Sequence, residues 1–302
     1  MTWTLTTSLD DFRTQAGDFL GARPAENTVL LTVVDRLVGR GPHAFGEGTP
    51  VFGWWSREPG GPVEGAFLRT PPFELRLGVM PDGAAAVLAG ELAAAGPEFT
   101  EVTGVSGGES AVRAFSAAWQ AGTGATGSLR FRQRLYRLGE LTGPPRPPAG
   151  RHRVAVPADR ELLIEWYEAF GIECTVELPN IAGTVDDRIA DGLLHVWEDD
   201  GRPVAMAGNS PVVAGMSRIG PVYTPAGARG HGYASGVTAA ASAAALARGA
   251  AEVLLYTDLA NPTSNSIYQQ IGYRPVEDCL TLDFVDVADL VGRGRLRTGR
   301  AG

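Results

Sequence analysis

Arg229-Gly230-His231-Gly232-Tyr233-Ala234 joins a β-rich segment, residues 217–224, to an Ala-rich segment that is predicted to form a helix from Tyr233 to Arg248. The first turn of a helix leaves backbone N–H groups without partners and carries the positive end of the helix dipole. Gly230 and Gly232 let the backbone approach an anion because neither has a Cβ. A strand, a glycine turn and a helix start in this order predict a phosphate-binding site.

The spacing of this hexapeptide narrows the kind of phosphate ligand. It lacks the Gly-Lys-Ser/Thr of the nucleotide-binding phosphate loop, and it does not follow the dinucleotide pattern Gly-x-Gly-x-x-Gly. The order Arg-x-x-Gly-x-Ala resembles the acyl-CoA signature of the GNAT acetyltransferase superfamily, (Gln/Arg)-x-x-Gly-x-(Gly/Ala). Taken alone, it is also compatible with a plain strand-to-helix turn.

A second motif follows downstream. Residues 252–257 are apolar and β-prone, which predicts a strand. The segment 261–273, Asn-Pro-Thr-Ser-Asn-Ser-Ile-Tyr-Gln-Gln-Ile-Gly-Tyr, then resembles the closing motif of the superfamily, Asn-x-x-(Ala/Ser)-x-x-x-Tyr-x-x-x-Gly-(Phe/Tyr). Asn261 suits a helix cap, Pro262 the first helical turn and Gly272 a left-handed helix end. Two motifs in this order, with a strand between them, are more specific than either alone.

Composition limits the classes of protein. The chain has 302 residues, enough for two domains, and 44% of them are hydrophobic, which excludes a disordered chain. The net charge is −8, every basic residue is Arg, and no basic run occurs, so we expect no binding to nucleic acid or to a membrane. An acidic surface is compatible with a cationic acceptor, and equally with ordinary solubility.

The cysteines, the histidines and the N-terminal residues predict no disulfide, no metal site and no signal peptide. Cys174 and Cys279 lie far apart and are expected to be buried free thiols in a reducing compartment. The four histidines show no ligand spacing, so no metal site is expected. Residues 1–9 do not resemble a signal peptide, and no apolar tract reaches the length of a membrane span. We therefore expect a cytoplasmic protein, whether monomer or homodimer.

The chain reads as two similar halves joined by a Pro-rich linker, residues 141–150. The first half predicts, in order, a strand 3–6, helices 9–20 and 27–38, strands 51–56, 63–69 and 74–79, a helix 82–95, a strand 101–105, a helix 110–121 and a strand 129–138. The second half predicts a strand 153–156, helices 158–170 and 183–191, strands 193–198, 203–208 and 216–224, a helix 233–248, a strand 252–257 and the helix that starts at Pro262. We expect an α+β fold in which each half is a twisted mixed sheet flanked by helices.

The two halves differ at the phosphate motif. After Met80-Pro81 the first half continues with Asp82, a negative charge at the place where a phosphate would bind, and Trp119 stands at about the position of Tyr268. We interpret residues 1–140 as a degenerate GNAT-like domain without a CoA motif and residues 151–302 as the acetyltransferase domain. The alternative is that the first half is an unrelated α+β domain.

The resemblance implies a binding mode for the coenzyme. In the family, the fourth and fifth strands separate at a bulge, for which Gly220-Pro221 is the candidate here, and the pantetheine arm lies in the gap. The implied acetyl-CoA contacts come from the end of the fourth strand, the glycine turn and the last helix: Val222, Tyr223, Thr224, Arg229, Gly230, His231, Gly232, Tyr233, Ala234, Ser235, Asn261, Ser264 and Tyr268.

The resemblance also implies direct attack of an amine on the thioester. Tyr268 matches the general acid of the family, which protonates the departing thiolate, and the Val222 N–H is the candidate donor to the oxyanion. The general base is less well defined. Glu173 is preferred over Glu177 and Asp258. Both glutamates are expected in a loop after the first helix of the second half. A water chain without a dedicated base is an alternative.

These features predict an acetyl-CoA-dependent N-acetyltransferase that acts on a primary amine, which could belong to a small molecule or a peptide. Two alternatives stay open: a non-catalytic acyl-CoA sensor or scaffold, and a transferase for a longer acyl group.

Overall fold

The computed structural model describes residues 2–95, 99 and 101–285. It divides into two compact units, unit 1 with Met1–Arg134 and Glu277–Gly302, and unit 2 with Leu135–Val276. The Pro-rich segment belongs to unit 2. The predicted domains 1–140 and 151–302 therefore correspond to the two halves of the sequence and have other boundaries than the compact units. Residues 286–302 of the second predicted domain lie outside the residues that the structure describes.

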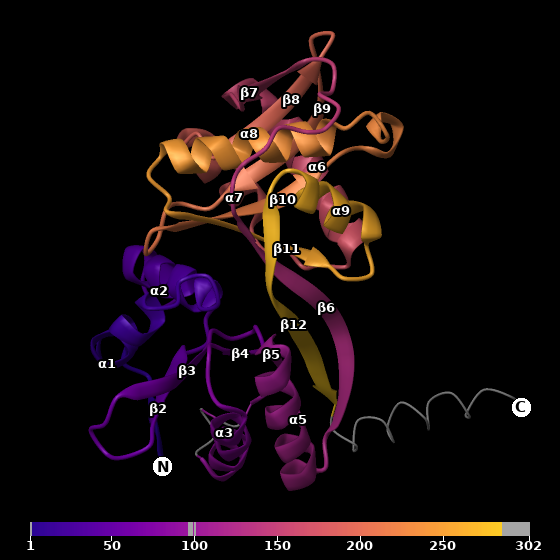
Figure 1. Ribbon diagram of the computed structural model, residues 1–302. Helices are drawn as coiled ribbons and strands as arrows, with labels where there is room; N and C mark the ends of the chain where they lie inside the picture. Colours follow the sequence, from indigo (N-terminus) through magenta and orange to yellow (C-terminus); the bar gives the residue numbers. More distant parts are fainter. Residues whose placement is uncertain (1, 96–98, 100, 286–302) are drawn as a thin grey trace, which may run out of the picture. The chain divides into compact units, whose positions relative to one another are not determined.

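The named elements follow the same order in both halves of the chain (Figure 1). In the first half they are β1 (Thr2–Thr6), α1 (Leu9–Gly21), α2 (Thr28–Arg40), β2 (Val51–Ser56), β3 (Val63–Arg69), β4 (Leu75–Leu77), α3 (Asp82–Ala94), β5 (Gly104–Gly108), α5 (Glu109–Thr123) and β6 (Thr126–Leu138). In the second half they are β7 (Arg151–Val154), the short 3₁₀ turn η1 (Pro157–Asp159), α6 (Arg160–Cys174), α7 (Ile181–Ala190), β8 (Leu194–Asp199), β9 (Arg202–Asn209), β10 (Met216–Tyr223), the 3₁₀ turn η2 (Ala226–Ala228), α8 (Tyr233–Ala247), β11 (Glu252–Asp258), α9 (Pro262–Gln270) and β12 (Tyr273–Val285). This order confirms the predicted repeat.

Unit 1 contains a mixed sheet in the order β1-β2-β3-β4-β5, followed by the last part of β12. Neighbouring strands are antiparallel except β4 and β5, where Leu75 pairs with Val105 and Arg76 with Ser106 in parallel. Buried side chains on the two faces of the sheet form separate clusters. One packs against α3 and α5 and includes Phe67, Leu88 and Phe115, and the other packs against α1 and α2.

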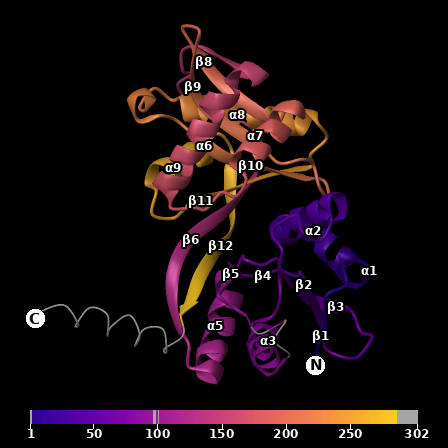
Figure 2. The same ribbon diagram turned by 180° about the vertical axis from the view of Figure 1, so that it is seen from behind.

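Unit 2 contains the sheet β7-β8-β9-β10-β11, followed by the end of β6. Along β9, Ala205 and Ala207 belong to the cluster that packs under α8, whereas Met206 belongs to the cluster that packs against α6 and α7. This alternation has the period of two that a strand requires. Helix α8 therefore covers one face of the sheet, and α6 and α7 cover the other (Figure 2).

The last strand of each half contributes to the sheet of the other unit. The residues of β6 from Leu135 onward belong to unit 2, where β6 lies next to β11. In unit 1, residues 279–283 of β12 pair with β5 in an antiparallel ladder. Each sheet is thus completed by a strand from the other half of the sequence.

Three predicted features were wrong in position or exposure. Helix α6 runs to Cys174 rather than ending near residue 170, and Thr175 ends it with a left-handed φ of 54°. Glu173 is therefore on the last helical turn, not in a loop. Strand β5 begins at Gly104 instead of residue 101, because the part that pairs with β12 is glycine-rich and carries a weak strand signal. Cys174 is exposed, and only Cys279 is buried.

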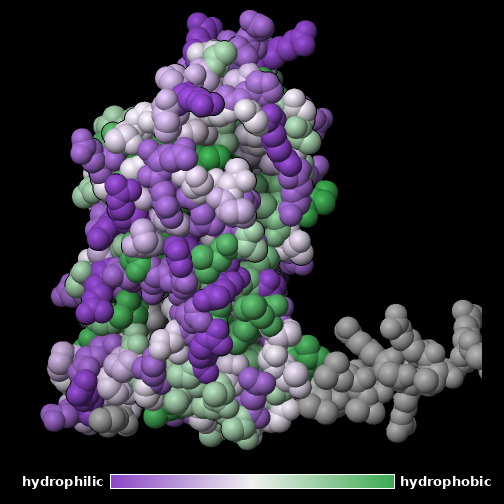
Figure 3. Space-filling view, turned by 45° about the vertical axis from the view of Figure 1, so that its right-hand side comes forward, coloured by the Kyte–Doolittle hydropathy of each residue, from purple (hydrophilic) through white to green (hydrophobic). Residues whose placement is uncertain are grey.

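In the space-filling view, hydrophilic residues cover much of the visible face, with smaller hydrophobic groups between them (Figure 3). Within the described residues, no helix combines the length and the apolar composition needed to cross a bilayer.

Candidate functional site

The glycine turn before α8 has the backbone geometry that the sequence predicted. Gly230 and Gly232 have φ values of 85° and 82°, in the left-handed region that favours glycine, and Gly232 is the N-cap of α8. The N–H of Gly236 donates to the Gly232 carbonyl at 3.1 Å, at the start of the helix. The N–H groups that precede this bond, from Tyr233 to Ser235, lie in the first turn, where an anion can accept from them.

Two buried hydroxyl groups near this turn have no hydrogen-bond partner among the described residues: the Oγ1 of Thr224 and the Oγ of Ser235. A buried polar atom without a partner costs free energy, and such atoms are uncommon in folded proteins. Unpaired hydroxyl donors beside a glycine turn and a helix start fit a phosphate-bearing group. Within the described part of the chain, both hydroxyls are thus unpaired donors close in sequence to the glycine turn.

Strands β10 and β11 separate next to the turn. Their parallel ladder runs from Met216 and Glu252 to Ile219 and Leu255 and ends there. Between Ile219 and Val222 the register of β10 against β9 shifts, and Val222 and Tyr223 then pair with β9. The shift coincides with Gly220-Pro221 and confirms the predicted bulge. Beyond it β11 offers the backbone of β10 no ladder partner, so the two strands are not hydrogen-bonded to each other there.

Arg188 on α7 is a site residue that the sequence did not indicate. Its Nη1 donates to the hydroxyl of Tyr167 at 2.6 Å and to the carbonyl of Gly220, in the bulge, at 2.8 Å. A charged donor to a backbone carbonyl is among the stronger hydrogen bonds in proteins. Arg188 thereby ties the irregular part of β10 to the helical layer of α6 and α7.

Helix α9 begins as predicted and positions Tyr268. The Asn261 side chain caps it by accepting a bond from the Ser264 N–H at 3.0 Å, and Pro262 occupies the first turn. Tyr268 is 8% exposed, and its ring lies edge-on to that of Tyr273, with the centroids 6.2 Å apart. Burial, with a smaller contribution from Cys174, raises the pKa of Tyr268 to about 12, so its hydroxyl is protonated at neutral pH.

Glu173 lies in a chain of polar contacts rather than alone at the surface. Its Oε2 is 2.6 Å from the Nη2 of Arg229, and its Oε1 accepts a bond from the Tyr223 hydroxyl at 3.1 Å. Arg229 also donates from Nε to the Thr224 carbonyl at 3.0 Å. These contacts bring together the preferred base and three predicted coenzyme-binding residues, Tyr223, Thr224 and Arg229.

The thiol of Cys174, next to Glu173, is not activated as a nucleophile. Although the residue is exposed, its thiol is partly removed from water, and this desolvation, with the nearby carboxylates of Glu173 and Asp258, raises its pKa and lowers the thiolate fraction at neutral pH. A role as acyl-enzyme nucleophile is therefore not favoured for Cys174, as the sequence indicated.

Asp258 is another candidate base. Its Oδ1 accepts a hydrogen bond from the Ala260 N–H at 2.8 Å.

His231 and Tyr233 lie at the edge of the turn. His231 is exposed and stacks on the Tyr233 ring at a centroid distance of 5.4 Å. The Tyr233 hydroxyl donates to Asp199 in the β8–β9 hairpin. Tyr233 therefore anchors the start of α8, and His231 has the exposed position expected of an ordinary loop residue.

Among the described residues of the first half, the helix that corresponds to α8 does not begin with a glycine turn. Helix α3 begins after Pro81 and not after a glycine turn, and the Asp82 carboxylate at its start accepts a bond from the Ser110 hydroxyl at 2.6 Å. Trp119 is buried and stacks on Phe115 in the core. A negative charge at the helix start and a core tryptophan fit the interpretation of this half as degenerate.

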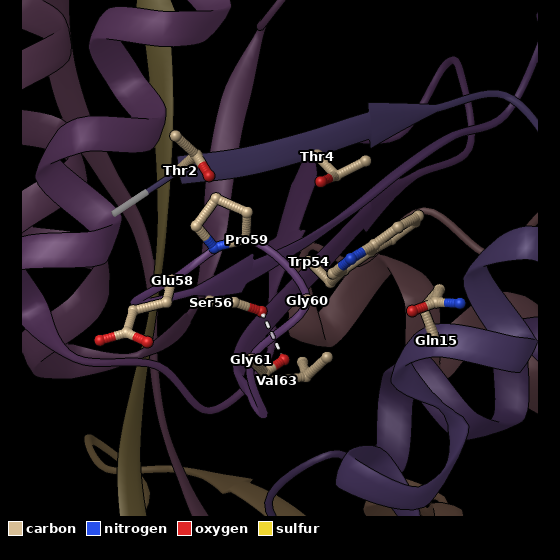
Figure 4. Close-up of a pocket in the computed structure, with 10 residues that line it drawn as sticks. All are labelled: Thr2, Thr4, Gln15, Trp54, Ser56, Glu58, Pro59, Gly60, Gly61 and Val63. Carbon is tan, nitrogen blue, oxygen red and sulfur yellow. Dashed lines mark hydrogen bonds between the residues drawn. The ribbon is translucent and has the colours of Figure 1, made fainter.

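Unit 1 contains a cavity of about 220 Å³ away from these elements (Figure 4). Its wall contains Thr2, Thr4, Trp54 and Ser56 from β1 and β2, and the β2–β3 turn closes one side, where Ser56 donates to the Gly61 carbonyl. Thr2 and Thr4 are exposed, Ser56 is buried, and the residues that line the cavity form no cluster of groups suited to acyl transfer. Within the described residues no group of three or more His, Cys, Asp and Glu residues could hold a metal ion.

The comparisons with known proteins agree with this geometry. Residues 160–273 match the acetyltransferase (GNAT) family, and this match supports a transferase enzyme. The matched range contains the glycine turn, the separated strands and Tyr268. The family uses acetyl-CoA and acetylates amines. No curated protein matches the sequence significantly.

Solved structures with a similar fold cover nearly the whole chain. A GNAT acetyltransferase from Colwellia psychrerythraea aligns with a TM-score of 0.60 at 11% identity, over 94% of this chain and 99% of its own. A GCN5-related N-acetyltransferase from Sphaerobacter thermophilus aligns with a TM-score of 0.58 at 17% identity, over 93% and 94%. A Drosophila protein aligns with a TM-score of 0.61 at 12% identity, over 94% and 98%. Both halves therefore have the GNAT fold.

Proposed function

We propose that this protein transfers the acetyl group of acetyl-CoA to a primary amine, which belongs to a small molecule or to a peptide. The observation that carries the proposal is the end of the β10–β11 ladder at Ile219 and Leu255, because this opening leads into the glycine turn at the start of α8. The opening would hold the thioester arm of the coenzyme, and the glycine turn would hold its diphosphate.

The coenzyme is expected to bind along this path. The N–H groups from Gly230 to Ser235 would donate to the oxygens of the diphosphate, and the unpaired hydroxyls of Thr224 and Ser235 would add donors. The backbone of Val222 and Tyr223, on the side not paired with β9, would bind the amides of pantetheine. Asn261 and Ser264 would shape the start of α9 beside the arm.

In the proposed reaction the amine nitrogen attacks the thioester carbonyl carbon directly. The C–N bond forms, the carbonyl oxygen takes up negative charge and accepts a bond from the Val222 N–H, and the C–S bond then breaks. Before the attack, the acceptor ammonium loses one proton to Glu173, which frees the lone pair of the nitrogen. As the C–S bond breaks, the sulfur receives a proton from the Tyr268 hydroxyl, and the second proton lost by the new amide nitrogen restores that hydroxyl. The products are an amide and free CoA.

The burial of Tyr268 supports its role. A pKa of about 12 keeps the proton on the hydroxyl until negative charge develops next to it. The thiolate would leave into the same low-dielectric surroundings, which raise the proton affinity of the sulfur as well. Burial therefore raises the proton affinity of both groups, and the Tyr268 hydroxyl gives up its proton only when the sulfur becomes charged.

A thiol-release assay tests the proposal. The full chain is mixed with acetyl-CoA and, in separate reactions, with primary amines that include putrescine, lysine, glucosamine and a short peptide with a free N-terminus. We expect release of free CoA thiol with at least one amine, together with the N-acetylated product by mass spectrometry. Binding of acetyl-CoA without thiol release across a broad amine panel would instead indicate a sensor.

A further inference from the structure

The Arg229–Glu173 ion pair connects two parts of unit 2 that the proposed reaction uses for different substrates. Arg229 directly precedes the glycine turn, and Glu173 lies on the last turn of α6. The side chains are about half exposed, 50% and 44%, so solvent and ligands can reach both. The hydroxyl of Tyr223 holds the second carboxylate oxygen of Glu173.

A diphosphate at the turn would compete with Glu173 for Arg229. Arg229 is adjacent in sequence to Gly230, the first residue of the proposed diphosphate cradle. A guanidinium binds phosphate oxygens in the same forked geometry with which it binds a carboxylate, and a diphosphate carries more negative charge. An arriving diphosphate therefore draws the guanidinium away from the carboxylate.

Once Arg229 binds the diphosphate, the Glu173 carboxylate lacks a positively charged partner. Glu173 keeps the Tyr223 hydroxyl, but the neighbouring Cys174 is neutral at neutral pH and Asp258 carries a charge of the same sign. A cation restores the charge balance at this position, and the acceptor in the proposed reaction is a protonated primary amine.

We propose that Glu173 exchanges partners: it pairs with Arg229 in the ligand-free protein and binds the ammonium group of the acceptor once the coenzyme has taken Arg229. This inference rests on the proposed function and adds a rule for substrates. Coenzyme and cationic amine bind with positive coupling, and a neutral alcohol of the same shape lacks it. By linkage, the amine strengthens coenzyme binding by the same factor.

The exchange predicts that the ligand-free ion pair weakens coenzyme binding. Isothermal calorimetry with CoA, which has no acetyl group to transfer, measures this directly. We expect Glu173→Gln to bind CoA about two- to fivefold more tightly than wild type, the range that partly exposed ion pairs give. Glu168→Gln is the matched control, because Glu168 is an exposed carboxylate on the same helix.

A double-mutant cycle separates the exchange from a general charge effect. In the Arg229→Gln background, Glu173→Gln should leave CoA affinity unchanged, because the competing guanidinium is gone. An equal gain from Glu173→Gln with and without Arg229, or an equal gain from Glu168→Gln, would overturn the exchange. Circular dichroism of each variant confirms that the fold is retained.

The amine part is tested with the amine that reacts fastest in the thiol-release panel. We expect that saturating amine tightens CoA binding in wild type and has no such effect in Glu173→Gln. The same tightening in both proteins contradicts the exchange while leaving the transferase intact. Failure of wild type to bind CoA at all contradicts the proposed function itself.

Discussion

Ile219 and Leu255 are the last paired residues of the parallel ladder between β10 and β11. Past this pair β10 keeps only its antiparallel partner β9, after a register shift at Gly220-Pro221. Arg188 fixes the shifted segment through the Gly220 carbonyl. The opening between two parallel strands is thus built into the backbone and held by a side chain from a different layer.

Replacing Tyr268 with Phe should reduce turnover and spare coenzyme binding. The ring keeps its packing against Tyr273, and only the proposed proton donor is lost. We expect kcat to fall by about 10²-fold or more, the usual contribution of a general acid. Steady-state kinetics and CoA calorimetry measure the two effects. Tyr273→Phe is the control, because it removes another buried hydroxyl, one bonded to Ser242, from the same cluster.

The pH profile gives a second test of Tyr268. Its raised pKa, about 12, means that the hydroxyl loses its proton only in strongly alkaline solution. A fall in kcat between pH 8 and pH 10 is therefore not expected from ionisation of this tyrosine. If wild type shows such a fall and Tyr268→Phe lacks it, the assigned protonation state is wrong.

His195 should make the protein less stable as the pH falls below neutral. It is 1% exposed, its Nδ1 lies 2.9 Å from the Nε2 of His152, and burial lowers its pKa to about 4. Above pH 6.5 the folded and unfolded states are both neutral here, so this group contributes no pH dependence. Below pH 6.5 only the unfolded chain binds the proton, which costs about 2 kcal/mol of stability by pH 5.

Urea unfolding at pH 7 and at pH 5 measures this loss for wild type and His195→Leu. The variant should lose less stability between pH 7 and pH 5. Part of the loss should remain, because burial also lowers the pKa of His152. The paired acids Asp159 and Asp186 have lowered pKa values and titrate below this window. Equal losses in both proteins would remove His195 from the explanation.

Replacing either of two helical glycines with alanine should change the free energy of unfolding, but in opposite directions at the two positions. At Gly236 an added Cβ would lie 2.8 Å from Pro148 and 2.9 Å from the ring of Trp197, whereas at Gly90 it would meet no atom within 4 Å. Alanine favours a helix by up to about 1 kcal/mol, and overpacking costs about 1–3 kcal/mol. Urea unfolding should show Gly236→Ala destabilised and Gly90→Ala stabilised. A gain at both positions would mean that the Pro-rich segment does not pack on α8.

Local signals in the sequence were sufficient for much of the fold. The Asn261 cap, the Pro262 start and the two strands on either side of the β8–β9 turn were predicted because each depends on neighbouring residues. That turn has positive φ at Asp200 and Gly201, 46° and 72°, as a two-residue hairpin with this sequence requires.

The contacts that organise the site could not be predicted in the same way. Arg188 and Gly220 are 32 residues apart, and Glu173 and Arg229 are 56 apart. Neither pair leaves a periodic pattern, because each contact exists only after helices and strands have packed. The exchange of β6 and β12 between the two sheets was missed for the same reason, since strand pairing over such distances has no local signature.

The central claim is that the glycine turn at the start of α8 binds the diphosphate of acetyl-CoA. A bulky residue at position 232 should abolish binding. Gly232 has a φ of 82°, which valine adopts only with strain, and the new side chain would enter the path of the phosphate. Gly227→Ala is the matched control, because Gly227 lies in the preceding 3₁₀ turn with open space around it and without a positive φ.

Calorimetric titration of acetyl-CoA into wild type, Gly232→Val and Gly227→Ala is the most direct measurement. The account predicts binding by wild type and by Gly227→Ala, and no detectable binding by a folded Gly232→Val protein. Undiminished affinity in Gly232→Val would show that the diphosphate lies elsewhere and would contradict the account.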